Sequence, residues 1–498
     1  MTDNKQKAQV WGKRLGATPD ELNLRFCSGR DVSTIPMADE ELFEYDIWTN
    51  LAHAKMLQKV GILEATELDL LTEALLGLHV KFVKGDFQLD PGKEDVHINI
   101  EHYITYDQNV EAGKKLHSGR SRNDQIATDM RLYLRDQLIN LSANVFDLLA
   151  SIHTQAQKEL KTVMPGFTHY QPAMLTTAAH WLTSWSQALL RDLESLLQNL
   201  KTLNKSPLGA AASFGTSWPI DREYCADLMG FDGVEDNTLD CISTRGENET
   251  RIAASVALLM NHLSTISQDI ILLSTPYYNM LKVDDRFVTG SSIMPQKRNP
   301  DFAELIRAKA SVSHGILLSL LGIQKGAISG YNRDTQQSKY LILDLMRECI
   351  EAPRLLAMVI KELDFDRQTM ADRSLEGFMN SADVADWLAR EYQLPFRECY
   401  DVLSLAVKKS DSMGRLTKEV LQESMDEMGF GIQIEVEISS ILDSPLSLLE
   451  KKQHTGAPSP DSVKKTITAQ SKQIAAFQEQ LQAIEERLNR AREGCFSA

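Results

Sequence analysis

Three short polar stretches of the chain carry the side chains that could do chemistry. One of them, GSSIMPQKRNP at 290–300, begins with small polar residues and ends with Lys297 and Asn299, where a helix is expected to start. Free backbone N–H groups and the positive end of a helix dipole attract anions at such a place. A serine in that field, such as Ser291, loses its proton more readily because the alkoxide is stabilised. The pattern is typical of an anion-binding catalytic loop or of a flexible loop that caps a helix.

The other two stretches could bind a carboxylate and transfer a proton. SGRSRND at 118–124 offers two arginines, two hydroxyls and an amide within seven residues, a rich set of donors for a carboxylate. Solvated arginines at a capped helix start are the alternative. GFTHYQP at 166–172 places His169 between Thr168 and Tyr170, where it could donate a proton or contact an anion, although a lone histidine is more often structural. None of the three stretches predicts a function by itself.

Long helices must position these stretches. Apolar residues recur every three or four positions in several segments, which predicts helices with one apolar face. The broad apolar faces favour a long-helix bundle that is partly buried between subunits. Helices are expected at 124–152, 175–203 and 252–273, from Asn299-Pro300-Asp301 onward, from Asp334 onward and, on the surface, at about 461–492.

Composition bounds the class of protein. The 498 residues include 53 Lys and Arg against 69 Asp and Glu, a net charge of −16. This acidic balance argues against a nucleic-acid partner, because phosphate binding needs clustered Lys and Arg. The pattern of helices and turns predicts an N-terminal helical domain at 1–115, a central bundle at 116–370 and a small C-terminal helical domain at 371–498.

Motifs of other protein classes are missing. The six cysteines form no CxxC pair and no zinc-ligand spacing with histidine, which suits free thiols in a reducing compartment. We find no secretory segment and no apolar run approaching the ~20 residues of a membrane span. A cytoplasmic location with no membrane partner is therefore expected. GxGxxG, P-loop, HExxH and GxSxG motifs are also absent, which leaves nucleotide-driven, zinc-hydrolase and serine-hydrolase activities without support.

Taken together, the three stretches resemble one enzyme family. GSSIMPQKRNP resembles the signature loop of the fumarase/aspartase superfamily, and KLHSGRSRNDQ with MPGFTHYQPAM resembles its argininosuccinate lyase branch. The similarity runs from about Asp46 to about Val463. It implies an all-α long-helix bundle, a homotetramer with a 20-helix core, active sites that each draw on three chains, and neither cofactor nor metal. The implied activity is reversible β-elimination of argininosuccinate to L-arginine and fumarate, the last step of arginine biosynthesis.

The resemblance also implies a role for each matching residue. Ser291 would be the base that removes a proton from the succinyl carbon, and Lys297 would stabilise the aci-carboxylate that forms. His169 would bind a succinyl carboxylate or protonate the leaving nitrogen. The substrate-binding residues would be Ser121, Arg122, Asn123, Thr168, Asn299, Tyr331, Gln336, Lys339 and Asn50. Asp95 and His97 would orient His169.

Some positions depart from the family pattern. Thr49-Asn50 stands where Gly-Ser is frequent, Gly246 where Asp is common, Gln337 where Glu is usual and Tyr400 where His is frequent. Because two of these positions lie near the expected leaving-group pocket, a lyase that releases fumarate from another N-succinyl amine or amino acid, such as an aminopolycarboxylate, is the alternative. Adenylosuccinate as the substrate fits the set of Tyr331, Gln336 and Lys339 less well than argininosuccinate does. A non-catalytic protein on this scaffold, like the lens crystallins of the family, has no need for intact catalytic residues.

Overall fold

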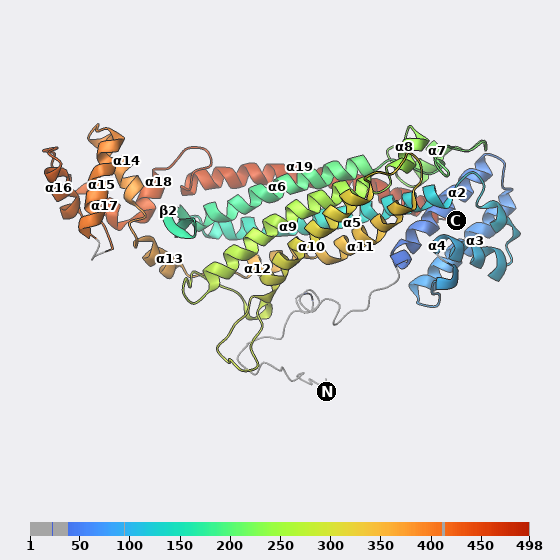
Figure 1. Ribbon diagram of the computed structural model, residues 1–498, viewed down its shortest axis with the longest axis horizontal. Coiled ribbons are helices and arrows are strands. Elements are labelled where there is room, and N and C mark those ends of the chain that lie inside the picture. The colour runs from blue at the N-terminus through green and yellow to red at the C-terminus, as the bar shows by residue number, and fades with distance from the viewer. Residues whose placement is uncertain (1–21, 23–37, 94, 411–413, 498) are drawn as a thin grey trace.

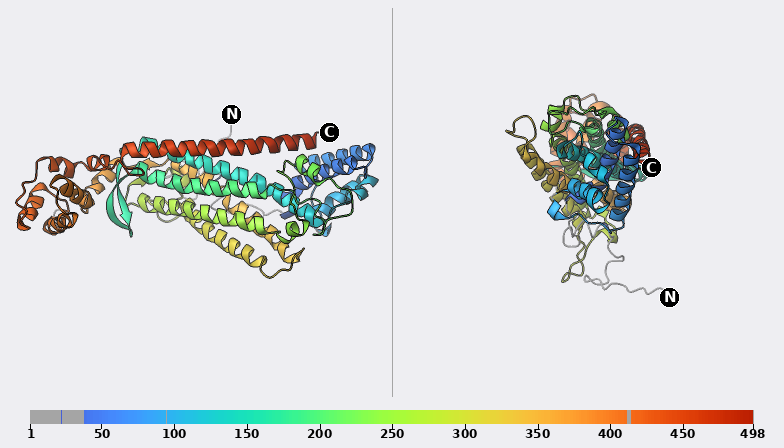
Figure 2. Two further views of the ribbon diagram at one scale, coloured as in Figure 1. Left: turned by 90° about the horizontal axis from the view of Figure 1, so that it is seen from above. Right: turned by 90° about the vertical axis from the view of Figure 1, so that its right-hand side faces the viewer.

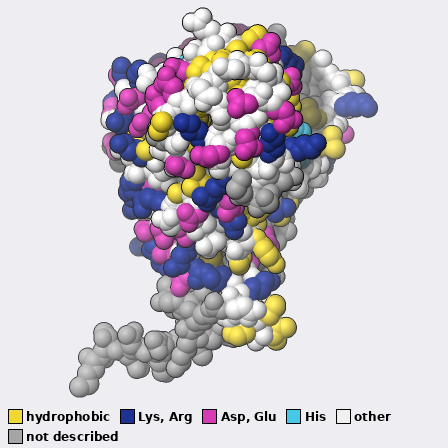
Figure 3. All heavy atoms as spheres, turned by 90° about the vertical axis from the view of Figure 1, so that its left-hand side faces the viewer, with side chains coloured by type: hydrophobic (Ala, Val, Ile, Leu, Met, Phe, Trp, Pro, Cys, Tyr) yellow, Lys and Arg dark blue, Asp and Glu magenta, His cyan; other side chains and the backbone are white. Residues whose placement is uncertain are grey.

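The computed structural model describes residues 22, 38–93, 95–410 and 414–497. These residues form an elongated bundle of long helices with a smaller helical unit at each end (Figure 1). The fold class is therefore the all-α bundle that the periodicity predicts. Over the face in view in Figure 3, acidic and basic side chains are interspersed.

The central bundle contains the long helices expected from the spacing of apolar residues. Helix α5 packs against α6 and α12, α6 packs against α9, and α9 packs against α10. Figure 2 shows α19 lying along the length of this bundle. The bundle helices are α5 (Arg122–Lys158), α6 (Ala178–Leu203), α9 (Glu247–Ser274), α10 (Asp301–Ile323), α11 (Gln336–Cys349), α12 (Ala352–Lys361) and α19 (Pro460–Phe496).

Shorter helices build the two ends. At the N-terminal end lie η2 (Ala38–Leu42), α2 (Phe43–Lys59), α3 (Ala65–Val83), η3 (Pro91–Lys93), α4 (Val96–His102), η4 (Tyr103–Asp107) and η5 (Glu111–Lys115), with α7 (Arg222–Leu228) and α8 (Thr238–Ser243) beside them. Of these, η4 is a short π-helix. Elsewhere in the chain lie the 3-10 turns η6 (Asp285–Phe287) and η7 (Arg333–Thr335). At the opposite end lie α13 (Arg367–Ser374), α14 (Ser381–Glu391), α15 (Phe396–Ser410), α16 (Lys418–Glu427), α17 (Glu437–Asp443) and α18 (Pro445–Glu450).

Two small antiparallel sheets accompany the helices. Strands β1 (Val163–Thr168) and β2 (Gln171–Thr177) form a hairpin between α5 and α6. Strands β3 (Leu281–Lys282) and β4 (Asp364–Phe365) form a second pair. The hairpin lies near the C-terminal unit, at the far end of the bundle from α2 to α4 (Figure 1).

The hydrophobic core is divided into two main clusters. The larger cluster joins the N-terminal unit and the bundle, and it includes the buried residues Val463, Ile467, Leu481 and Leu488 of α19. The smaller cluster lies within 379–449 and also takes in Val163 and Leu175 of the hairpin. The hairpin is therefore fixed to the C-terminal unit by packing, whereas α19 is part of the bundle.

Helices α9 and α10 leave apolar side chains on the outside of the chain. Leu258 of α9 and Val312, Leu318 and Leu321 of α10 are exposed. By length and composition alone, these two described helices could span a membrane, but half of the α9 window is buried inside the chain. Exposed apolar side chains on long helices are typical of surfaces that pack against another subunit.

Candidate active site

A cavity of about 730 Å³ brings together most of the predicted substrate-binding residues. Its wall is built by η2, the start of α4, one face of α5, the start of α9, and the segment that leads into α11. The predicted residues in the wall are Asp95, His97, Ser121, Arg122, Asn123, Tyr331, Gln336 and Lys339. Residues from distant parts of the sequence thus meet in one place.

The SGRSRND stretch enters this cavity as the first turn of α5. Ser121 is the N-cap and accepts a hydrogen bond from the Asn123 N–H, while the Asp124 carboxylate accepts one from the Ser121 N–H at 2.8 Å. Gly119 has a φ of 76°, and a Cβ there would lie 2.6 Å from an Ile220 methyl carbon. Glycine is therefore required at this turn, because both the conformation and the space exclude a side chain.

Arg122 and Asp95 join two helix starts at the mouth of the cavity. The Asp95 carboxylate caps α4 by accepting from the Ile98 N–H at 2.9 Å, and its other oxygen accepts from the Arg122 guanidinium at 2.9 Å. Asp95 thereby places Arg122 at the rim. Ion pairing at this half-exposed place contributes geometry more than stability.

Arg245 and Tyr331 also line the cavity. The Arg245 guanidinium lies 5.2 Å from the centroid of the Tyr331 ring and donates to the Asn123 side-chain oxygen at 3.1 Å. Burial lowers the pKa of Arg245. The next residue, Gly246, is the N-cap of α9 with a φ of 92°. That left-handed conformation explains the departure from Asp, since glycine adopts it without strain.

Lys339 is held by a residue that the motifs did not reveal. Its ammonium lies 2.5 Å from Asp39 Oδ1, and Asp39 Oδ2 accepts from the Val96 N–H at 3.1 Å. Gln336, one turn earlier on α11, accepts a bond from Arg333 at 3.3 Å. Asp39 is buried, so it fixes Lys339 relative to the start of α4.

Glu249 is a carboxylate in the cavity wall without a side-chain partner. It is only 9% exposed, and no side chain that the structure describes donates a hydrogen bond to it or pairs with it. Burial raises its pKa, while Arg245, Arg131 and nearby backbone N–H groups limit the rise. An unpaired carboxylate in a cavity is suited to a cationic ligand group.

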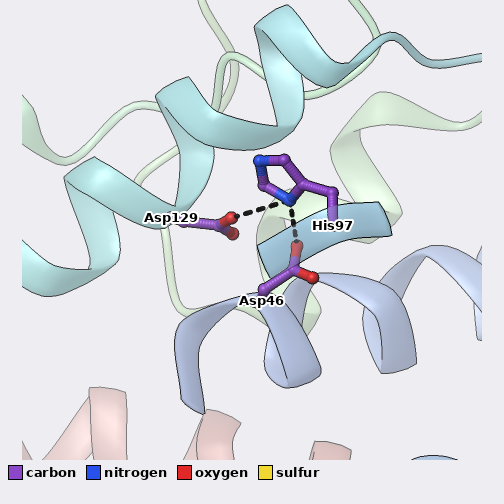
Figure 4. Close-up of side chains that lie close together, drawn as sticks. All are labelled: Asp46, His97 and Asp129. Atoms are coloured by element: carbon purple, nitrogen blue, oxygen red, sulfur yellow. Dashed lines mark hydrogen bonds and ion pairs between the residues drawn. The ribbon is translucent and has the colours of Figure 1, made fainter. Parts of the chain in front are cut away.

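Behind the cavity wall lies a buried cluster of a histidine and two carboxylates (Figure 4). His97 Nδ1 is 2.8 Å from Asp46 Oδ1 and 3.7 Å from Asp129 Oδ2. Thr49 donates to the other Asp129 oxygen at 2.6 Å. The three residues come from α4, α2 and α5, so the cluster connects the N-terminal unit to the bundle.

Asn50 belongs to this cluster and does not line the cavity. Its amide nitrogen donates to Asp46 Oδ2 at 3.0 Å and to the Asp46 carbonyl at 2.8 Å. Its carbonyl oxygen accepts from the Arg120 guanidinium at 2.5 Å. Gln125 donates to Asp46 Oδ1 at 2.6 Å. Asn50 therefore links a buried arginine to a buried aspartate.

Charge balance explains how such a cluster is tolerated. Burial opposes ionisation of Asp46, but the charge and hydrogen bond of His97, together with Arg120 and Gln125, lower its pKa. Burial and the neighbouring Asp46 raise the pKa of Asp129 well above its ordinary value. The donor atoms of Asp46, His97 and Asp129 lie within 4.8 Å of one another, a spacing that a metal ion can bridge. N–H groups bond to both Asp46 oxygens, and Thr49 bonds to Asp129 Oδ1, which makes the cluster a hydrogen-bond network. Asp129 Oδ2 has no hydrogen-bond partner among the described residues.

Thr168 and His169 lie elsewhere, at the tip of the hairpin. Thr168 pairs with Gln171, and the turn residues His169 and Tyr170 have φ values of 52° and 60°. Two positive values in a two-residue loop are the pattern of a type I′ turn, which non-glycine residues adopt at a cost. Thr168, His169 and Tyr170 are all exposed. Thr168 lines a second cavity of about 740 Å³, formed with α14 and residues 451–458.

Ser291, Lys297 and Asn299 lie on a third, separate loop. Thr289 and Asn299 exchange backbone hydrogen bonds at 3.0 and 2.9 Å, which closes the base of the loop. Within it, Ser291 Oγ accepts from the Met294 N–H at 3.1 Å, and Lys297 is exposed. Asn299 donates to the Gly290 carbonyl at 3.3 Å. Because its backbone and side chain hold the loop base, Asn299 does not cap α10, which starts at Asp301 with Pro300 at the N-cap.

A single chain thus keeps the three polar regions apart. SGRSRND is at the N-terminal end of the bundle, the hairpin is near the C-terminal unit, and 289–299 extends from the side (Figure 1). Neither of the two cavities contains Ser291, His169 or Lys297. The structure brings eight of the predicted residues together and leaves the predicted base and carboxylate binders outside.

Among the cavity residues that went unrecognised in the sequence are Asp39, Arg245 and Glu249. A signal for Glu249 was present, since it lies three residues before Ile252 and continues the apolar stripe of Ile252, Val256 and Leu259. A carboxylate in a buried stripe marks either a buried pair or a ligand site. Asp39 and Arg245 stand in ordinary polar segments, and no spacing distinguishes them.

Comparison with known proteins gives consistent matches. A family model described as lyase matches residues 33–315, and one described as argininosuccinate lyase C-terminal matches residues 378–447. The chain is 38% identical over 471 residues to an argininosuccinate lyase of Alcanivorax borkumensis, a match that covers 94% of this chain and 98% of that protein.

Solved structures are similar over nearly the whole chain. An EDDS lyase variant with bound fumarate superimposes with a TM-score of 0.85 at 25% identity, covering 97% of this chain and 95% of that one. A class II fumarase from Schistosoma mansoni superimposes with a TM-score of 0.68 at 14% identity, covering 86% of this chain and 95% of the other. The latter likeness establishes the fumarase-type fold alone.

Proposed function

The chain belongs to the argininosuccinate lyase family and is a carbon–nitrogen lyase, and from this premise we propose that it eliminates fumarate from argininosuccinate and releases L-arginine. The reaction would be reversible and would form the last step of arginine biosynthesis. The observation that carries this proposal is the cavity of about 730 Å³, whose wall contains Tyr331, Gln336 and Lys339 together with Ser121, Arg122 and Asn123 of the SGRSRND stretch. A phenol, an amide and an ammonium can bind the α-carboxylate of an amino acid.

The proposed mechanism divides the substrate between the separate regions. Ser291 removes a proton from the succinyl carbon, and Lys297 and Asn299 stabilise the aci-carboxylate, where negative charge develops. Thr168 and His169 bind the succinyl carboxylates. Ser121, Arg122 and Asn123 position the substrate in the cavity, and Tyr331, Gln336 and Lys339 bind the amino-acid half.

The residues around the cavity take supporting roles in this proposal. Asp95 holds Arg122, since they are bonded at 2.9 Å. Asn50 supports Arg120 from inside the protein, because its side-chain oxygen bonds to Arg120 and its side-chain nitrogen bonds to Asp46. Glu249 faces the cationic end of the leaving group.

We propose a homotetramer whose active sites are shared between chains. The three polar regions lie apart in one chain, and Ser291 can meet the cavity of another chain if the long helices associate. The exposed apolar residues Leu258, Val312, Leu318 and Leu321 support such association. A cytoplasmic location is supported by the buried free thiols of the described cysteines, which a reducing compartment maintains.

A mixing experiment tests the shared site. Ser291→Ala and Tyr331→Phe tetramers, each inactive or nearly so, would be dissociated, mixed and reassembled. Recovery of activity is expected, because some sites in a mixed tetramer combine an intact loop from one chain with an intact cavity from another. Mixed tetramers that stay as inactive as the parents would place each site within a single chain.

A related lyase acting on another N-succinyl amine is the second candidate. The overall fit to an EDDS lyase variant that holds fumarate favours fumarate as the product. It leaves open which amine departs. The 38% identity to an argininosuccinate lyase, against 25% to the EDDS lyase variant, favours arginine.

Fumarate release by the purified protein, followed by absorbance, decides between these candidates. Argininosuccinate would be compared with adenylosuccinate, aspartate, malate and a series of N-succinyl amines. Selective release from argininosuccinate is expected. Selective release of fumarate from another compound of this panel would support the same elimination with a different leaving group. If the folded protein released fumarate from none of these compounds, the enzymatic function would be refuted.

A further inference from the structure

His97 connects the cavity to a fully buried carboxylate. Its Nδ1 lies 2.8 Å from Asp46 Oδ1, and Asp46 has no exposed surface. In Figure 4 the second ring nitrogen, Nε2, is on the side of the ring away from Asp46, and no dashed line joins it to either carboxylate. No side chain that the structure describes bonds to this Nε2, and His97 lines the cavity. One edge of the ring is thus fixed inside the protein, and the other is left for a ligand.

The surroundings of Asp46 keep it ionised. Gln125 and Asn50 donate to its two oxygens, and Arg120 lies on the far side of Asn50. With the charge of His97, these groups lower the Asp46 pKa despite complete burial. An ionised carboxylate on Nδ1 fixes the tautomer and orientation of an imidazole and stabilises its cationic form.

We propose that His97 is the proton donor to the leaving nitrogen and that Asp46 is the positioning residue that holds its ring. This inference rests on the proposed elimination. The base takes a proton from the succinyl carbon, and the C–N bond breaks with its electron pair passing to nitrogen. Nitrogen then takes the proton on His97 Nε2. Water returns a proton to His97 and accepts the one held by the base, so no further reactant is required.

Other groups of the cavity are less suited to this step. His117 also lines it, but burial and Arg120 lower the His117 pKa, which leaves its ring neutral at pH 7. The Lys339 ammonium is bonded to Asp39, and the Arg122 guanidinium is bonded to Asp95. A guanidinium does not give up a proton near neutrality. His169, the acid that the family resemblance suggests, lies on the hairpin, and in the proposed mechanism it binds a succinyl carboxylate.

The test uses the dependence of rate on the basicity of the leaving amine. His97→Asn keeps an amide N–H close to the Nδ1 position, so it can still bond to Asp46, but it has no counterpart of Nε2. For N-succinyl amines of increasing amine basicity, the loss of kcat should grow from a few-fold to about 10²–10⁴-fold, because basic amines depend most on protonation. Asp46→Asn should show a smaller loss with the same trend.

Matched variants separate catalysis from folding. His153, a buried histidine of α5 bonded to Gln470, lies outside the cavity, and His153→Asn should lower stability without any dependence on the amine. An equal loss for all amines in His97→Asn would overturn the inference. The inference would also be overturned if only His169→Asn showed a loss of kcat that grows with the basicity of the amine. A wild-type protein that releases no fumarate from any amine would instead refute the proposed elimination, and the His97 assignment with it.

Discussion

Replacing Asn50 by Ser would restore the residue that is frequent in the family, yet we expect it to destabilise this protein. Asn50 is 2% exposed, and its amide spans the gap between Arg120 and Asp46. Serine is shorter and carries a single oxygen. Its hydroxyl can bond back to the Asp46 carbonyl one helical turn earlier, as serine does in helices. It cannot bridge the two charged groups at the same time.

The size of the effect follows from the bonds that are lost. Arg120 is buried, and its Nε and Nη1 atoms have no partner in the part of the chain that the structure describes. Losing Asn50 removes the 2.5 Å bond to Nη2 as well. A hydrogen bond to a charged group contributes about 1.5–3 kcal/mol, and the retained backbone bond recovers part of the total. We expect a loss of about 2–3 kcal/mol in the free energy of unfolding.

Thermal unfolding followed by circular dichroism measures this loss. Asn50→Ser should lower Tm by several degrees, while kcat/KM for argininosuccinate relative to other N-succinyl amines stays unchanged. Gln337→Glu, which restores the usual family residue at an exposed position, is the control and should change stability by less than about 0.5 kcal/mol. An unchanged Tm with an altered choice of amine would refute the reasoning and return Asn50 to the substrate.

Three further variants test other parts of the site. Ser291→Ala should leave the circular dichroism spectrum unchanged and lower kcat by at least about 10²–10⁴-fold, and near-wild-type activity would show that Ser291 is not the base. Glu249→Gln should lower kcat/KM by about 10- to 100-fold for amines with a cationic group, chiefly through KM, and have little effect for neutral amines. Burial raises the Asp124 pKa from 3.8 to about 6, so folding holds this proton more tightly than the unfolded chain does. The stability of wild type relative to Asp124→Asn should therefore fall by about 3 kcal/mol between about pH 4 and pH 6, as measured by Tm against pH, and a constant difference would contradict the assignment.

Local periodicity was sufficient to predict the long helices. The stripe of Ile252, Val256 and Leu259 is buried in α9 as expected, because a face that repeats every three or four residues can be buried only as a helix. Pairing between distant segments was not predictable in this way. Leu175 lies in the segment expected to be helical, but it pairs with Pro165 in the hairpin, and α6 starts only at Ala178.

The same limit applies to the site. Tyr331, Gln336 and Lys339 could be recognised because their spacing matches a family pattern. Asp39 could not be recognised, because its role is to bind Lys339, which lies 300 positions away in the sequence. Such a contact depends on the packing of η2 against α11, which no local pattern records. Family resemblance therefore found the residues that touch the substrate better than the residues that hold them.

The contrast between the two halves of the proposed site has a consequence for variants. The cavity is held by bonds between helix starts, such as Arg122 to Asp95, and by the buried Asp46 cluster behind it. The loop that carries Ser291 is largely exposed, and Thr289 and Asn299 close its base. A rigid half can select the amine, whereas a loop that closes over the succinyl group acts on the part that every substrate shares. Substitutions of residues that line the cavity should therefore change the ranking of amines, and substitutions in the loop should lower the rate for all of them by the same factor.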